Sequence, residues 1–126
     1  MREYKFRGRR IDTGEWVYGY LIGHDVIVGN IVEWDSEYFC TEFWYKVDPE
    51  TVGQYTGLKD RNGKEIYEGD IVLLGNNKRL IKFDRGSFTM FDGESRRSPL
   101  SDYVVENRLE VIGNIYEYPE LLAGRA

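Results

Sequence analysis

Residues 54–72 constrain the fold most, because they place two turn signals between extended stretches. The first signal is Asn62-Gly63, a dipeptide that accepts positive φ at both central positions of a tight turn at little steric cost. The second is Gly69-Asp70, where the aspartate carboxylate can accept hydrogen bonds from nearby backbone. The apolar run 71–74 follows at once. The segment therefore predicts a hairpin that leads directly into a new strand, which is a structural hinge and not a catalytic loop.

Alternation of apolar and polar residues with a period of two recurs along the chain and indicates short strands. Residues 16–22 carry Trp16, Tyr18 and Tyr20 on one face and apolar residues or glycine on the other, so we expect a central or covered strand. Residues 39–47 predict one continuous strand with Trp44 on its second face. The remaining expected strands are 4–7, 26–28 (with a bend at 29–30), 71–74, 80–84, 88–91, 103–105 and 109–116.

Helix is expected only in two short pieces. Asp48, Pro49 and Glu50 have the residue types of a helix N-cap and first turn, and a further helical turn is expected at 119–122. Short strands separated by glycine and asparagine turns predict an all-β protein of barrel or sandwich type. With 126 residues, the chain fits one domain or two very small ones.

The charge and cysteine content exclude several classes. Because 22 acidic residues face 17 basic ones, the net charge of −5 argues against a general nucleic-acid binder. Cys40 is the only cysteine, so no disulfide can form within the chain, which fits a reducing cytoplasm. No apolar run approaches the roughly 20 residues of a membrane helix. We expect a soluble cytoplasmic protein without membrane contact.

The sequence of 54–72, QYTGLKDRNGKEIYEGDIV, resembles the signature of the YopX family of bacteriophages and prophages. Residues 5–7, 111–117 and 119–122 extend the resemblance over nearly the whole chain. It implies a β-rich architecture with an SH3-like barrel in the second half. The five strands expected after Gly69 match the number of strands in such a barrel. We therefore expect β-hairpins in residues 1–58 and the barrel in 59–126, with the two parts able to share one core. The resemblance implies a bacterial host cytoplasm and no known activity.

Candidate residues for chemistry are few. His24 and Cys40 are the only nitrogen and sulfur ligands of the kind that zinc prefers, and nothing in their spacing links them. The acidic cluster of Asp60, Glu65, Glu68 and Asp70 is better explained by turns and exposed strand positions than by cation binding or acid–base catalysis. We therefore expect no catalytic residue, no metal and no cofactor, and the protein is predicted not to be an enzyme.

Two binding hypotheses remain. Aromatic side chains exceed what a small barrel can bury, and Trp and Tyr are favoured at interface hot spots. This favours a phage accessory protein that self-associates and contacts another phage or host protein. The candidate interface residues are Trp16, Tyr18, Tyr20, Trp44, Arg96 and Arg97. The alternative is a nucleic-acid-binding barrel of phage replication or expression, with a patch made by Arg7, Arg9, Arg10, Arg85, Arg96 and Arg97. A hydrolase is the least supported alternative.

Overall fold

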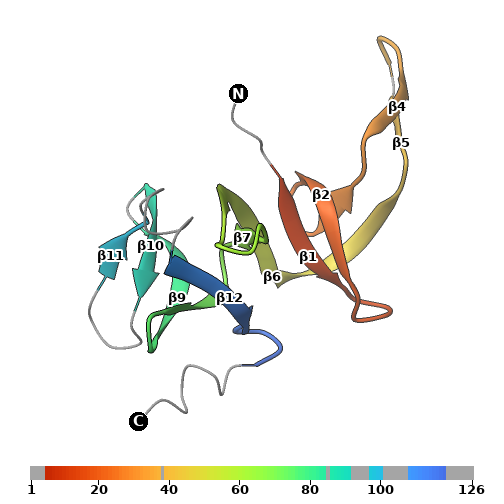
Figure 1. The fold of residues 1–126 in the computed structure, drawn as a ribbon. Coiled ribbons are helices and arrows are strands. Elements are labelled where there is room, and N and C mark those ends of the chain that lie inside the picture. Colours follow the sequence, from red (N-terminus) through yellow and green to blue (C-terminus); the bar gives the residue numbers. More distant parts are fainter. Residues whose placement is uncertain (1–4, 38, 85, 92–96, 101–107, 119–126) are drawn as a thin grey trace. The chain divides into compact units, whose positions relative to one another are not determined.

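The computed structural model describes residues 5–37, 39–84, 86–91, 97–100 and 108–118 (Figure 1). Strands make up nearly all regular structure in these ranges, which confirms the all-β prediction. The chain divides into two compact units, one ending at Gln54 and one beginning at Tyr55. The strands are β1 (Phe6–Arg10), β2 (Trp16–Ile22), β3 (Val26–Val28), β4 (Ile31–Trp34), β5 (Phe39–Thr41), β6 (Trp44–Lys59), β7 (Glu65–Tyr67), β8 (Asp70–Leu74), β9 (Asn77–Asp84), β10 (Ser87–Phe91), β11 (Arg97–Pro99) and β12 (Leu109–Asn114).

The first unit is a small closed barrel. β1 pairs with β2, β2 with β3, β3 with the start of β6, and a later part of β6 returns to β1, all antiparallel. Ile27 and Val47 are completely buried in this unit. Two glycines permit the close approach of its strands: a Cβ at Gly19 would overlap the carbonyl oxygen of Val28, and one at Gly8 would lie 2.7 Å from Val47 Cγ2. Closure leaves the four barrel strands without free edges.

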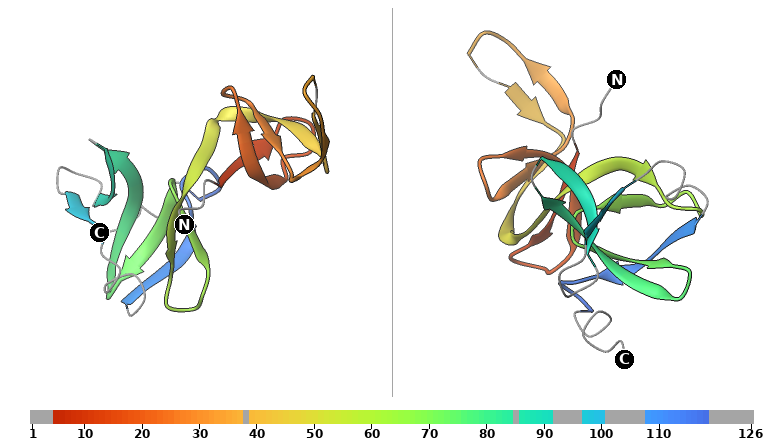
Figure 2. Two further views of the ribbon diagram at one scale, coloured as in Figure 1. Left: turned by 90° about the horizontal axis from the view of Figure 1, so that it is seen from above. Right: turned by 90° about the vertical axis from the view of Figure 1, so that its left-hand side faces the viewer.

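A two-stranded arm, β4–β5, continues the β3–β6 pairing away from the barrel of its own unit (Figures 1 and 2). The link is made by two backbone hydrogen bonds, from Gly29 N to Phe43 O at 3.0 Å and from Glu42 N to Asn30 O at 2.9 Å. The expected strand 26–28 ends where predicted, since residues 29–30 separate β3 from β4. The prediction of one continuous strand over 39–47 is wrong. Residues 42–43, which lie opposite the interruption at 29–30, separate β5 from β6.

The helix predicted after Asp48 is also wrong, because this segment belongs to β6 and pairs with β1. The capping bond itself forms: Asp48 Oδ1 accepts a hydrogen bond from Glu50 N at 3.0 Å. Thr51 Oγ1 donates to Asp48 O and accepts from Arg9 N at 2.9 Å. These bonds stabilise an irregularity in the β1–β6 ladder, where Arg7 faces Gly53 and Arg9 faces Asp48. Local capping signals are real here, but pairing with β1 decides the conformation.

The second unit contains a five-stranded antiparallel sheet in the order β11-β10-β9-β8-β12, together with the hairpin formed by the end of β6 and β7. Its buried core consists of Ile66, Val72, Ile81, Met90 and Leu109. In β12 the register shifts between Val111 and Gly113, as at a β-bulge. The finer assignment to an SH3-like barrel stays a prediction. The strand expected at 103–105 and the helical turn at 119–122 lie outside the described residues.

The hairpin of the 54–72 segment forms, but its turn lies one residue earlier than predicted. Asp60 O accepts from Gly63 N at 2.9 Å and Asp60 N donates to Lys64 O at 2.8 Å, so Arg61, Asn62 and Gly63 form a three-residue loop. Gly63 has φ of +82°, the left-handed conformation that ends such loops. The Asn-Gly pair therefore does not occupy the two central turn positions. The second turn is confirmed, since Asp70 Oδ2 accepts from Tyr67 N at 2.8 Å.

Candidate interaction surface

The outer side of the first-unit barrel carries an aromatic face, which we define as Tyr18, Tyr20, Ile22 and Trp44. Alternation along β2 turns Tyr18, Tyr20 and Ile22 outward. The side chain of Tyr18 is 48% exposed and that of Tyr20 is 50% exposed. Trp44 reaches the same face from β6, because Tyr20 pairs with Val28 and Val28 pairs with Trp44 across three adjacent strands. Trp44 is 64% exposed. Large apolar side chains thus line one continuous side of the sheet.

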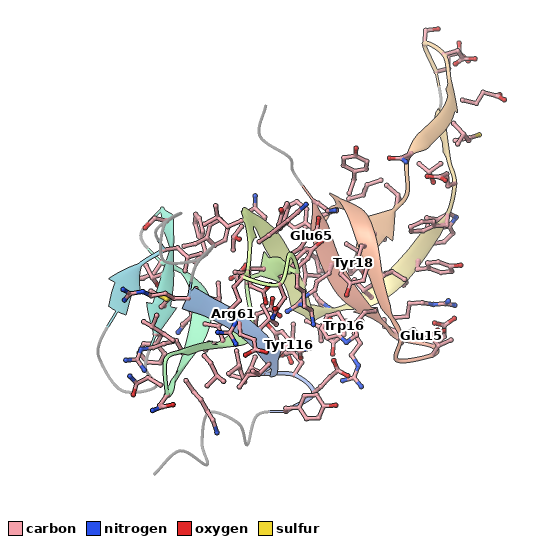
Figure 3. The ribbon with its side chains drawn as sticks, in the orientation of Figure 1. Glu15, Trp16, Tyr18, Arg61, Glu65 and Tyr116 are labelled. Carbon is pink, nitrogen blue, oxygen red and sulfur yellow. The ribbon has the colours of Figure 1, made fainter. Side chains whose placement is uncertain are left out.

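Trp16 precedes this face on β2 and is held differently. Figure 3 shows Trp16 and Tyr18 on the same strand. The guanidinium carbon of Arg7 lies 4.9 Å from the centroid of the Trp16 ring, and Arg7 itself is buried. This cation–π contact covers part of the indole, which is half-buried. Of the four aromatic residues predicted for the interface, Tyr18, Tyr20 and Trp44 are exposed together, and Trp16 is partly engaged within its own unit.

A hollow of about 290 Å³ lies beside the aromatic face, at the base of the arm. Tyr18 and Tyr20 form part of its wall, and Lys5 and Glu42 supply one charge of each sign. Glu42 is fixed there, because its Oε1 accepts a hydrogen bond from Asn30 N at 3.1 Å. The hollow thus combines aromatic rings with polar and charged groups in its lining. Its size suits one inserted side chain better than a large ligand.

A charged cluster lies at the C-terminal end of β1. Arg10 donates two hydrogen bonds to Asp12, at 2.9 Å and 2.7 Å, and its guanidinium carbon lies 3.8 Å from the ring centroid of Tyr45. The hydrogen bond from Arg10 holds the pKa of the Asp12 carboxyl below its ordinary value. The same hydrogen bond raises the pKa of Arg10. This cation is therefore committed to an intramolecular partner.

The remaining predicted binding residues gain less support. Arg96 and Arg85 lie outside the described residues, and Arg97 is described only as backbone in β11, where it pairs with Phe91. His24 lies in the turn between β2 and β3, and Cys40 is on the arm; both are exposed. No group of three or more metal-ligating side chains is found within the ranges that the structure covers.

The two buried residues of the acidic cluster in 54–72, Asp60 and Asp70, have structural roles. Asp60 is buried, and its Oδ1 accepts from Asn62 N and Lys64 N, each at 2.9 Å. Its Oδ2 accepts from Val111 N at 2.9 Å and so ties the hairpin loop to β12. A carboxylate with three backbone donors is occupied, which leaves little capacity for a cation. The sequence signal for this role is an aspartate two residues before the Asn-Gly pair, the spacing of an Asx turn.

A second hollow, of about 510 Å³, lies in the second unit. Leu73 and Leu74 of β8 form its apolar part, with Arg61, Arg108 and Glu110 around them. Arg61 is engaged by Glu110, with 3.1 Å between Nη2 and Oε1. Arg61, labelled in Figure 3, is the first residue of the hairpin loop. The hollow therefore offers a shallow mixed surface rather than a constellation of reactive groups.

The described part of the chain has no helix long and apolar enough to cross a membrane.

The chain is similar to a protein family and to solved structures. The sequence profile of the family described as YopX protein matches residues 5–123. No curated protein matches the sequence. Among solved structures, protein EF1440 from Enterococcus faecalis is similar, with a TM-score of 0.70 and 25% sequence identity, over 97% of this chain and 99% of that one. Protein yopX from Bacillus subtilis is similar in fold, with a TM-score of 0.52 and 20% identity, over 100% of both chains.

Proposed function

The chain belongs to the YopX family, and we propose that it is a non-enzymatic accessory protein that acts by protein–protein contact and associates with further copies of itself through the aromatic face. The setting that we propose is the cytoplasm of a bacterium that carries a phage or prophage. In this proposal the aromatic face is the self-association surface, and other surfaces engage a phage or host protein.

The exposure of the aromatic face is the observation that carries the proposal. Tyr18, Tyr20 and Trp44 are each about half exposed or more, whereas Ile27 and Val47 of the same unit are completely buried. The exposed rings therefore cannot be extra core of that barrel. Tyr and Trp supply most of the energy at many interfaces, because they bury a large apolar area at a small loss of side-chain entropy.

A second copy of the chain is the partner that we infer for this face. Most soluble assemblies are closed homo-oligomers, in which the same patch of two subunits meets across a symmetry axis. A face of mainly apolar and aromatic side chains suits such self-pairing, because it brings no like charges together. The hollow beside it offers room for a side chain from the second copy.

The nucleic-acid alternative finds less support. Of its predicted patch, Arg7 is buried against Trp16 and Arg10 is bonded to Asp12, so neither cation is available for a phosphate. Retention on a DNA or RNA column that weakens with salt would favour this alternative, because phosphate contacts release counterions.

Sedimentation velocity with single substitutions tests the proposal. Trp44→Ala and Tyr18→Ala should each weaken self-association by roughly thirtyfold, because loss of an interface hot spot costs about 2 kcal/mol. Phe83→Ala is the matched control, since Phe83 is an aromatic residue of the second unit with 50% exposure. Association that is unchanged in both aromatic-face variants, or weakened equally in the control, would rule out this face.

A further inference from the structure

The β4–β5 arm has an unusual position for a pair of strands. Elsewhere in the first unit, closure of the barrel leaves strand edges paired on both sides, but the arm is a separate two-stranded sheet. An isolated two-stranded hairpin is marginally stable in water, and its outer edges present unpaired N–H and C=O groups. The arm is therefore the part of the first unit to which another strand can be added without unfolding anything.

The two edges of the arm are not equivalent. On β4 the register shifts between Ile31 and Glu33 while β5 advances by one residue from Thr41 to Cys40, so Val32 is the extra residue of a β-bulge. Bulges twist a strand and make its edge a poor template for pairing. β5 has no such interruption over 39–41, and in the described residues no further strand pairs with its outer edge. The accessible template is thus the outer edge of β5.

The charged residues of the arm and its base are all acidic. Residues 31–42 contain Glu33, Asp35, Glu37 and Glu42, and no lysine, arginine or histidine. These four residues are exposed. Like charges placed opposite each other across strands are destabilising, so the arms of two copies are poorly suited to pair with one another. A strand with basic side chains has the matching charge.

We propose that the outer edge of β5 binds an extended, positively charged segment of another protein by β-strand addition. The backbone of the incoming strand pairs with β5, and its basic side chains lie beside the carboxylates of the arm. In this mode main-chain hydrogen bonds supply affinity and the side chains supply specificity. This binding site is separate from the aromatic face, so it goes beyond the self-association proposed above.

Peptide binding to the full-length chain tests the proposal. The probe is a capped peptide of about six residues, the usual strand length, with alternating lysine and valine. Its control replaces the valines with proline, which keeps the charge but removes every second N–H group and fixes φ at about −65°, away from the extended value of a β-ladder. We expect the lysine–valine peptide to bind and to slow amide hydrogen exchange over residues 39–41, and the proline peptide not to bind. Equal binding of both peptides, or binding of neither, would overturn the proposal.

A charge reversal on the arm separates this site from self-association. The double variant Glu33→Lys/Glu37→Lys should bind the lysine–valine peptide more weakly by about tenfold or more, because a close charge pair at an interface contributes about 1.5 kcal/mol or more. It should gain binding of a glutamate–valine peptide. The control Glu15→Lys/Glu50→Lys changes the net charge equally at exposed first-unit positions outside the arm. Peptide binding that survives the arm variant contradicts the proposal, as does an arm variant whose sedimentation changes while its peptide binding does not.

Discussion

Gly63 and Gly69 both have positive φ, at +82° and +95°, but their surroundings differ. A Cβ added at Gly63 meets nothing within 4 Å, so Gly63→Ala introduces backbone strain alone. A Cβ added at Gly69 lies 2.8 Å from Cε2 of Tyr116, so Gly69→Ala adds overpacking to the same strain. The left-handed conformation costs a non-glycine residue about 1–2 kcal/mol, part of which is offset by a stiffer unfolded chain. Overpacking adds about 1–3 kcal/mol.

We therefore expect Gly63→Ala to lower the free energy of unfolding by about 1 kcal/mol and Gly69→Ala by about 2–4 kcal/mol. Urea unfolding followed by far-ultraviolet circular dichroism measures both values. Gly75→Ala is the matched control, because Gly75 also has positive φ, at +65°, and open space around its Cβ position. Its loss should equal that of Gly63→Ala. Equal losses for all three variants would refute the role assigned to Tyr116, and no loss at Gly63 would refute the turn geometry.

Three further predictions concern single groups. Asp60→Asn should lower the free energy of unfolding by about 2–3 kcal/mol, measured by urea unfolding, because an amide directs either a donor or a weaker acceptor at the N–H of Val111. Asp12→Asn should remove part of the pH dependence of stability. The pKa of Asp12 is lowered in the folded state, so its ionised carboxylate stabilises the fold fully above the ordinary pKa of 3.8, and this stabilisation is lost as the pH falls through the lowered pKa. Melting temperatures taken below pH 4 should therefore fall less steeply in this variant than in the wild type. Ile66→Ala should cost about 2–5 kcal/mol by thermal or urea unfolding, because it opens a cavity in the second-unit core.

Periodicity and turn chemistry were sufficient to predict much of the fold. The bounds of β2 follow from alternation, and those of β3 follow from an apolar run between glycine-containing turns. The alternation also predicted that Tyr18 and Tyr20 share one face of their strand and that Trp44 lies on the second face of its own strand, but it did not predict that these faces are exposed. Their union into one face depended on register: only the pairing of Tyr20 with Val28 and of Val28 with Trp44 brings β2 and β6 together. Register between distant strands is not encoded in local spacing.

Long-range contacts explain the errors. Asp48 does accept the capping bond that suggested a helix, but β1 offers a ladder that outweighs one local turn. The Asn62-Gly63 turn is displaced because the carboxylate of Asp60, buried against β12, orders the loop from one residue earlier. Acidic residues in turns are normally solvated, so burial of Asp60 could be foreseen only with its distant partner in place. The break at 42–43 between β5 and β6 was not predicted for the same reason, since it lies opposite the interruption at 29–30 in the partner strand.

The molar mass of the wild-type chain in solution tests the central claim most directly. One chain has a mass of 14.8 kDa. If a second copy covers the aromatic face as proposed, sedimentation equilibrium over a range of micromolar concentrations should give a multiple of this value that approaches the mass of one chain only on dilution. A mass of 14.8 kDa at every concentration would contradict self-association and leave the aromatic face to a different protein.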